Sequence, residues 1–311
     1  DWVFGAAKAH GKRSEAFEAA SGGTSFSYNL ALNLETSFTG KDLLYTRLRA
    51  GNMNNVFTGL FSQEYGFDSG NAVKINRMWY SFPIGENFTV VGGPMVRMDD
   101  MLPVWPSAYP AAMTYDFFTY AGAPGAYNLW LGAGAGVYWK SDDFSISTSY
   151  LSSNGNESNP NTGGIGTDGA DFSATTQIAY APENWGIAAA YTKASGANGV
   201  GLYSGNGTRG AVALSLSDGQ TNSYGLSAWW TPEESGWIPS ISTGWGLTDI
   251  SDSEARYISS ATTQSWYVGL EWSDVFLDGN SFGMAVGQPT FISDIDVKGR
   301  KNESDYIPGS G

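Results

Sequence analysis

The sequence predicts an all-β protein whose antiparallel strands form a transmembrane β-barrel. Three observations lead to this fold class. Apolar and polar residues alternate with period two over most of the chain, which is typical of strands with one apolar and one polar face. The links between these strands alternate between short and long, and aromatic residues gather beside the short ones. Both features are typical of barrels that span a membrane.

The composition excludes several classes of protein. The chain has 311 residues, only 15% of them charged, and a formal net charge of −14. It has no Cys and a single His, His10, so we expect no disulfide, no metal site, no cofactor and no catalytic triad, and we do not expect an enzyme. The acidic balance argues against a nucleic-acid partner, which requires a basic surface. No stretch approaches the roughly 20 apolar residues of a membrane-spanning helix.

The alternation predicts thirteen strands. We treat residues 1–311 as a single barrel domain, and we assign the alternating stretch 209–217 to a hairpin within a long loop. The predicted strands are 1–10, 25–37, 42–51, 72–83, 87–96, 127–140, 143–152, 171–181, 185–194, 220–231, 237–249, 263–273 and 280–292.

The links between the strands indicate the type of barrel. An up-and-down meander places every second link at the same end, and transmembrane barrels have short turns at one end and long loops at the other. Short links lie near 38–41, 84–87, 140–143, 181–184, 231–236 and 273–280. Long links lie near 11–24, 52–71, 97–126, 152–170, 195–219 and 250–262. Bacterial single-chain barrels have even strand numbers, so we expect a domain that is incomplete at its C-terminus and has sixteen strands when complete.

Aromatic side chains beside the short links predict a girdle at the membrane interface, where an amphipathic ring has its apolar body in lipid. They are Trp79, Tyr80, Phe82, Phe88, Tyr138, Trp139, Phe144, Tyr180, Trp185, Trp229, Trp230, Trp237, Trp272, Phe276 and Phe282. Two runs of alternate glycines, 132–136 and 244–246, each lie on one face of a strand. They are explained equally well by a loop that approaches the wall closely or by strand curvature.

Three strings of residues resemble a known family. The turn Thr36-Ser-Phe-Thr-Gly-Lys-Asp42, the string Tyr80-Ser-Phe-Pro-Ile-Gly85 and the string Trp272-Ser-Asp-Val-Phe-Leu-Asp-Gly-Asn280 are similar to those of cyanobacterial outer-membrane porins, a branch of the carbohydrate-selective porin family. The resemblance covers 25–95 and 263–290, whereas 97–126 departs from the family. It implies an integral outer-membrane channel, usually a homotrimer, whose relatives often carry an N-terminal module that grips the cell wall.

Four basic residues are candidates for the lining of the pore. Arg47 and Arg49 lie two apart and therefore share a face, opposite apolar residues such as Leu48. A charge that faces lipid at the midplane costs about 2–4 kcal/mol, so we expect both arginines to face the lumen. Lys74 and Arg77 are three apart, so strict alternation places them on opposite faces and leaves their roles open.

The long link 97–126 is the candidate for a constriction loop that folds into the lumen. It is unusually apolar for a loop, with Trp105 and Phe117 among many such residues, and loops of this length are usually functional. Its Asp99, Asp100 and Asp116 are expected to face the arginines across a narrow aperture and to set up a transverse field. The alternative is an external cap packed against a neighbouring subunit.

The expected function is passive diffusion of small hydrophilic solutes and inorganic ions, with membrane lipid and lipopolysaccharide as partners. Inward arginines favour anions, whereas the net charge of −14 favours cations at the outer vestibule. Exposed loop charges are screened within about 8–10 Å, so the arginines are given more weight. One alternative is an abundant outer-membrane tether with a secondary channel, and another is a soluble lectin-like β-protein.

Overall fold

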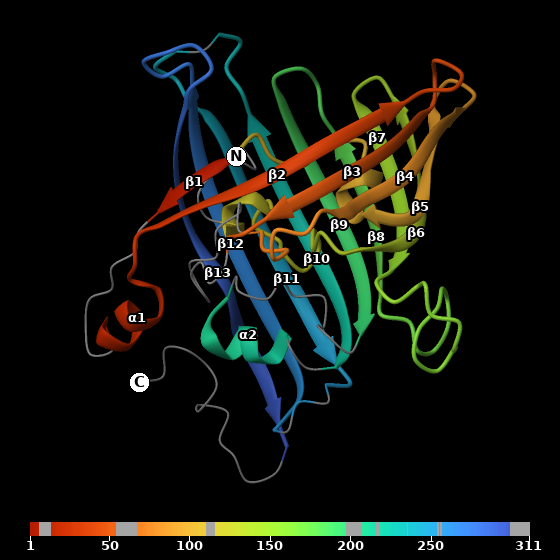
Figure 1. Ribbon diagram of the computed structural model, residues 1–311, viewed down its shortest axis with the longest axis vertical. Coiled ribbons are helices and arrows are strands. Elements are labelled where there is room, and N and C mark those ends of the chain that lie inside the picture. Colours follow the sequence, from red (N-terminus) through yellow and green to blue (C-terminus); the bar gives the residue numbers. More distant parts are fainter. Residues whose placement is uncertain are drawn as a thin grey trace.

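The computed structural model describes residues 1–5, 14–53, 67–109, 116–196, 207–215, 218–234, 236–253, 255 and 257–298. It forms one antiparallel sheet in which thirteen strands follow one another in chain order (Figure 1). The strands are β1 (Trp2–Gly5), β2 (Ser25–Thr36), β3 (Leu43–Gly51), β4 (Lys74–Ile84), β5 (Phe88–Arg97), β6 (Leu131–Ser141), β7 (Phe144–Ser152), β8 (Phe172–Tyr180), β9 (Trp185–Gly196), β10 (Gly219–Trp230), β11 (Ser240–Ser251), β12 (Ile258–Ser273) and β13 (Ser281–Val297).

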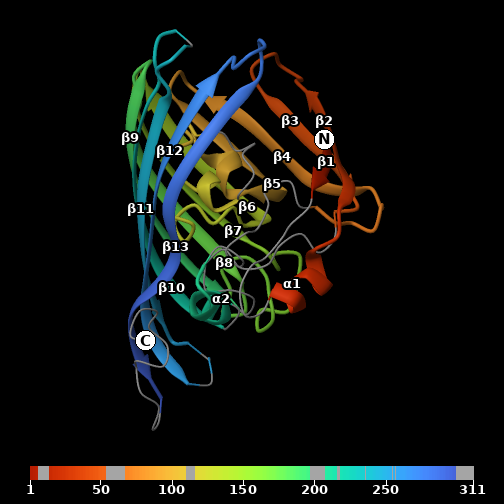
Figure 2. The ribbon, with the colours of Figure 1, turned by 90° about the vertical axis from the view of Figure 1, so that its left-hand side faces the viewer.

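The all-β fold class and the antiparallel meander are confirmed. The helices are short: α1 (Ser14–Ser21), η2 (Met98–Met101), η3 (Asp116–Thr119) and α2 (Arg209–Ser215). No helix in the described part of the chain is long and apolar enough to cross a membrane. The sheet curves strongly, and the segment between β5 and β6 lies on its concave side (Figure 2).

Short and long links lie at opposite ends of the sheet, as the sequence predicts (Figure 1). One predicted long link is wrong. The link 250–262 shrinks to residues 252–257, because β11 continues to Ser251 and β12 begins at Ile258. Ile250 pairs with Ala261 in the ladder, so a run of Ser and Thr that resembles a loop in sequence extends the strand.

The two faces of the sheet differ in chemistry. On the convex face of β2, Leu30, Leu32 and Leu34 are 43%, 50% and 54% exposed. Such exposure of large apolar side chains continues around the sheet. It includes Ile84, Phe88, Ile146, Ile178, Ile187, Leu226, Ile241, Met284 and Val286. Soluble proteins rarely expose so much contiguous apolar surface, and its extent fits contact with lipid.

The aromatic residues near the short links are divided between the two faces. Trp139 contacts Phe144, Tyr180 contacts Trp185, and Trp272 contacts Phe282, with ring centroids 6.0, 5.5 and 5.7 Å apart. Three predicted girdle residues lie on the concave face instead, because successive side chains along a strand point to opposite faces of the sheet. They are Trp79, Tyr138 and Trp229. The ring of Trp79 stacks on Tyr45, Tyr138 packs on the core, and Trp229 pairs with Ser242 in the ladder.

The predicted hairpin at 209–217 is wrong, since residues 209–215 form the helix α2. Ala211 and Leu214, three apart in the sequence, are 2% and 1% exposed. A spacing of three puts two apolar side chains on one face of a helix but on opposite faces of a regular strand. A short alternating run such as Ala211-Val-Ala-Leu214 fits either period, and only the packing decides between them.

The turn between β2 and β3 is organised by a single carboxylate. Asp42 accepts hydrogen bonds from the backbone N–H of Thr39 at 2.7 Å, from the Thr39 hydroxyl at 2.6 Å and from the Ser37 hydroxyl at 2.9 Å. The hydroxyl of Tyr80, from the next hairpin, donates to it at 2.6 Å. These bonds explain why the turn needs Ser, Thr and Asp at these positions.

Asp42→Asn is expected to weaken this turn in a pH-dependent way. Hydrogen bonds from Thr39 and then Tyr80 hold the pKa of Asp42 well below its usual range. The folded pKa is lowered, so the stabilisation is complete above the unfolded pKa of about 3.9 and is lost as the pH falls through the folded value. The urea midpoint of the variant should fall below that of the natural protein at pH 7, and the gap should narrow at pH 3. Asp142→Asn, in another short turn, is the control, and a gap that does not change with pH contradicts this account.

Candidate functional site

Basic side chains from β3 and β4 form a wall on the concave face of the sheet. In the ladder Arg47 lies opposite Arg77, and Arg49 lies opposite Lys74. Residues that lie directly opposite in an antiparallel pair point to the same face. The strict alternation that separates Lys74 from Arg77 fails here because a β-bulge at Asn76 inserts one extra residue, and a bulge reverses the facing of everything beyond it. All four basic residues therefore share the concave face.

Neutral groups orient the two β3 arginines. Arg47 Nε donates to Asn33 Oδ1 at 2.8 Å, and Arg49 Nε donates to Asn29 Oδ1 at 2.9 Å. The guanidinium of Arg49 also lies 4.0 Å from the centre of the Phe67 ring. Amide oxygens and aromatic rings fix the position of a guanidinium without cancelling its formal charge. Arg47 and Arg49 therefore bring two guanidinium groups to the wall formed by β2 and β3.

Arg77 belongs instead to a balanced cluster of four charges. Its Nε lies 3.0 Å from Asp100 Oδ2, and the side chain of Arg97 forms a second ion pair with Asp99. Asp100 Oδ2 also accepts a hydrogen bond from the backbone N–H of Arg97 at 2.8 Å. Arg77 is only 2% exposed, and a buried charge of this kind requires a partner. The cluster joins the start of the loop to the wall.

The position of these acids differs from the sequence expectation. Asp99 and Asp100 lie beside the arginine wall, because η2 begins at Met98 directly after β5 ends at Arg97. They pair with Arg97 and Arg77 instead of facing Arg47 and Arg49 across an aperture. Arg97 is not among the residues predicted from the sequence, although an arginine two residues before an aspartate at a strand end is visible there.

Asp116 is only partly described. Its backbone begins η3, on the far part of the same loop, and its side chain lies outside the described residues, as does the loop segment 110–115. Its predicted role stays a prediction.

The loop between β5 and β6 crosses the concave face and is hydrogen-bonded to the opposite wall. At its tip the backbone N–H groups of Ala108 and Tyr109 donate to Ser242 Oγ at 2.8 and 3.0 Å, and the hydroxyls of Ser107 and Tyr267 lie 2.7 Å apart. On its return Gly122 O, Ala126 O and Asn128 bond to Ser265, Thr192 and Ser173. The loop therefore covers the inner faces of β8 to β12 (Figure 2).

Apolar contacts hold the loop in the same place. Near the start of the loop, Met98 and Met101 pack with Val91, Val96 and Leu151 of the wall. At its far part, Phe117 and Tyr109 pack with Tyr267. These side chains are almost fully buried, which explains why this loop is so apolar.

The two glycine runs serve different purposes. A Cβ on Gly244 would lie 1.8 Å from Ala121 O, and one on Gly246 would lie 2.7 Å from Ala123 Cα. Both contacts are with the loop. A Cβ on Gly132 or Gly134 would instead meet the backbone of β7, at 2.1 and 2.2 Å. The glycines of β11 therefore leave room for the loop to pack against the wall, whereas Gly132 and Gly134 of β6 leave room for the backbone of β7.

Gly244→Ala is expected to displace the loop. A contact of 1.8 Å between a methyl group and a carbonyl oxygen is far inside van der Waals distance, so residues 121–123 have to move outward from β11. This displacement moves the loop away from β11 and toward the wall of β2 and β3, so in a channel the variant should conduct less strongly than the natural protein in planar bilayers and show noisier open states. Gly236→Ala is the matched control, since nothing lies within 4 Å of its added Cβ. Equal conductance of both variants would contradict the close fit.

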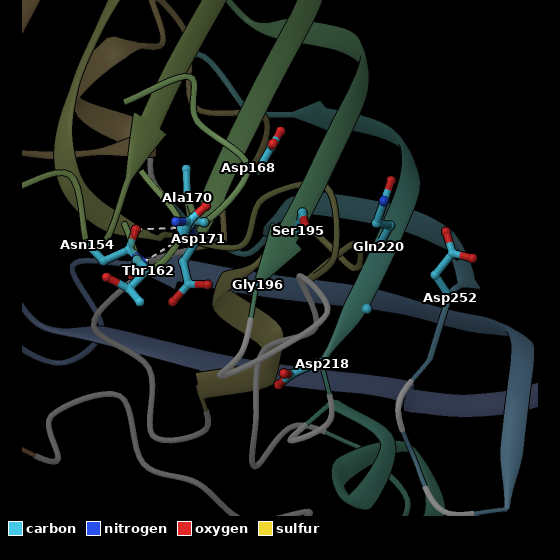
Figure 3. A pocket seen from close by; sticks show the side chains of 13 residues that line it. Asn154, Thr162, Asp168, Ala170, Asp171, Ser195, Gly196, Asp218, Gln220 and Asp252 are labelled. Atoms are coloured by element: carbon cyan, nitrogen blue, oxygen red, sulfur yellow. Dashed lines mark hydrogen bonds between the residues drawn. The ribbon is translucent and has the colours of Figure 1, made fainter. Parts of the chain in front are cut away.

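An acidic hollow of about 660 Å³ lies at the long-loop end of β8 to β10 (Figure 3). Its lining includes Asp168, Asp171, Asp218 and Asp252. The Asn154 side chain orders its rim, donating to Thr162 O at 3.0 Å and accepting from the N–H of Asp171 at 2.8 Å. Within the described residues, no group of three or more His, Cys, Asp or Glu is arranged to hold a metal ion.

The fold is that of bacterial outer-membrane porins. The chain superposes on OprB of Pseudomonas putida with a TM-score of 0.55 and 11% identity, over 86% of this chain and 70% of that one. It superposes on an anion-selective porin from Comamonas acidovorans with a TM-score of 0.50 and 11% identity, over 87% and 74%. At such identities the likeness concerns the fold alone.

Sequence relatives come from cyanobacteria. An uncharacterized protein of Synechocystis sp. is 29% identical over 89% of this chain and 54% of its own length. One of Nostoc sp. is 28% identical over 91% and 53%. The chain therefore spans about half the length of the curated relatives that it matches. No family model matches the chain, and nothing in these likenesses confirms the carbohydrate-selective branch.

Proposed function

We propose that the protein is an integral outer-membrane porin, a passive diffusion channel for small hydrophilic solutes and ions. One observation carries the proposal. A curved sheet with an apolar convex face holds a loop across its concave face, and the described residues of this loop leave the basic side chains of β3 open. Apolar outer surfaces and polar interiors suit a wall between lipid and water. Residues 98–130, between β5 and β6, are the proposed constriction.

Anions are the proposed preferred solutes. Arg47, Arg49 and Lys74 lie on the uncovered wall, whereas Arg77 is neutralised by Asp100. The acidic hollow lies at the long-loop end, where its charges act on solutes before they reach the narrow part. Fixed charges at a narrow site outweigh screened charges at a wide mouth.

The assembly and the partners of the whole protein are part of the proposal. We propose a homotrimer surrounded by membrane lipid and lipopolysaccharide, with attachment of the full-length protein to the cell wall through an N-terminal module. The loop between β5 and β6 is bonded within its own subunit at Ser107, Gly122 and Ala126. That arrangement favours the constriction over a cap on a neighbouring subunit.

Planar bilayer recordings of the full-length protein test the channel. Stable conductance steps, with a reversal potential that favours anions under a salt gradient, support the proposal. No conductance above that of the bare membrane refutes it. In that case the alternative, an outer-membrane tether, predicts that deletion loosens the envelope without changing its permeability.

A further inference from the structure

The helix α2 covers an apolar patch on the concave face of the sheet that the loop between β5 and β6 leaves open. Ala211 and Leu214 of α2 pack against Ile250, Ile258, Ile292 and Ile295, and all of these side chains are at most 8% exposed. The isoleucines come from β11, β12 and β13. Elsewhere most inner positions of these strands are Ser, Thr or Gly, for example Ser242 and Thr263, and the large inner Tyr267 lies under the loop between β5 and β6. Large apolar side chains on an inner wall make sense only under a cover.

The backbone fixes α2 to the wall at its start. Gly207 forms a parallel bridge with Thr290 of β13, and the N–H of Thr208 donates to Thr290 O at 2.8 Å. Thr290 lies beside a bulge in the pairing of β12 and β13, which frees its carbonyl for this contact. A Cβ on Gly207 would lie 3.0 Å from that oxygen, so glycine suits this approach.

The helix lies within the curve of the sheet, toward the end with the long loops (Figure 2). It is far in sequence from the loop between β5 and β6 and rests on a different part of the wall. We infer that α2 is a second, fixed constriction element, which narrows the outer mouth of the pore independently of that loop. This inference rests on the proposed channel function. It assigns α2 a role in the size limit for solutes.

A thiol-protection experiment tests the packing without any use of conductance. The chain contains no Cys, so Ile292→Cys introduces a unique thiol under α2. We expect a charged, water-soluble maleimide to label it at least about tenfold more slowly than Ser251→Cys, an exposed position on the neighbouring rim. Equal rates would overturn the inference, because α2 would then not cover the wall.

Leu214→Asp tests the effect on the pore. A carboxylate among four isoleucines shifts the helix toward an undocked state by at least about tenfold. Labelling of Ile292→Cys should then accelerate, conductance should rise, and larger polyethylene glycols should enter from the long-loop side only. The matched control is Val212→Asp, on the same helix but outside the apolar cluster.

The outcomes separate the inference from the proposed function. Faster labelling with unchanged conductance and an unchanged polymer limit would show that α2 does not narrow the pore. A natural protein that never conducts would refute the channel itself, whatever the labelling shows. If Leu214→Asp fails to insert, Ile292→Cys in the otherwise natural chain still decides whether α2 covers the wall.

Discussion

Replacing Arg47 and Arg49 with glutamine should shift the reversal potential of the channel toward cations. Both guanidinium groups lie on the part of the wall that the described residues of the loop between β5 and β6 leave open, and the Nε of each donates to an amide oxygen of β2. At about 6 Å in water each unit charge changes the free energy of a passing ion by about 0.7 kcal/mol. Two charges therefore change the permeability of an anion and that of a cation by about tenfold each, in opposite directions, and the ratio of the two by about a hundredfold. Glutamine keeps a polar side chain and leaves the strand intact.

The measurement is the reversal potential under a tenfold salt gradient, at two ionic strengths. Higher salt should reduce the effect, since screening shortens the range of both charges. Lys41→Gln is the control, because it removes a positive charge from an exposed short turn instead of the wall. An unchanged reversal potential in the double variant would show that these arginines do not line the path of the ions.

Replacing Arg77 with methionine should destabilise the protein more than any other single change considered for the wall. Methionine preserves much of the volume but leaves the carboxylate of Asp100 without the guanidinium 3.0 Å away. Removing one partner of a buried ion pair costs about 3–5 kcal/mol. The lower end applies here, because the side chain of Asp100 is 17% exposed.

The double variant Arg77→Met/Asp100→Asn allows the interaction energy of the ion pair to be measured apart from the other contacts of the two side chains. Asparagine still offers an oxygen to the N–H of Arg97, so the double variant should regain most of the stability that Arg77→Met loses. Urea unfolding in lipid vesicles measures all three variants, and the cycle gives the coupling energy. If the losses of the two single variants simply add, the ion pair does not hold the start of the loop.

The strands could be predicted from sequence because the period of two is a local property. Every strand from β2 to β13 overlaps its predicted segment, and the convex face of β2 follows directly from its alternation. The facing of Lys74 could not be predicted in this way. One extra residue at Asn76 reverses the parity, and nothing in that stretch of sequence distinguishes a bulge from a regular strand.

The loop contacts were also beyond sequence reasoning, for a different physical reason. Ser242, Thr192 and Ser265 look like any inward-facing residues of a water-filled channel, and only the fold shows that they bond to the loop. In the sequence, Gly244 fitted either a closely approaching loop or strand curvature, and the position of Ala121 shows that the loop is the reason. The sequence pointed to both acids of η2, but it did not predict that Asp100 pairs with Arg77. These two residues are twenty-three positions apart in the chain, and the pairing of β4 with β5 brings them together.

The bonds between the loop and the far wall also set an order of folding. Every ladder in the sheet joins strands that are neighbours along the chain, so the contacts of the ladders are more local than those between the loop and the far wall and can form earlier. The bond between Ser107 and Tyr267, by contrast, spans 160 residues. This bond, and those to Ser242, can form only after β11 and β12 have joined the sheet. The proposed constriction is therefore the last part of the pore to form, and a partly assembled chain presents a wide, unobstructed trough.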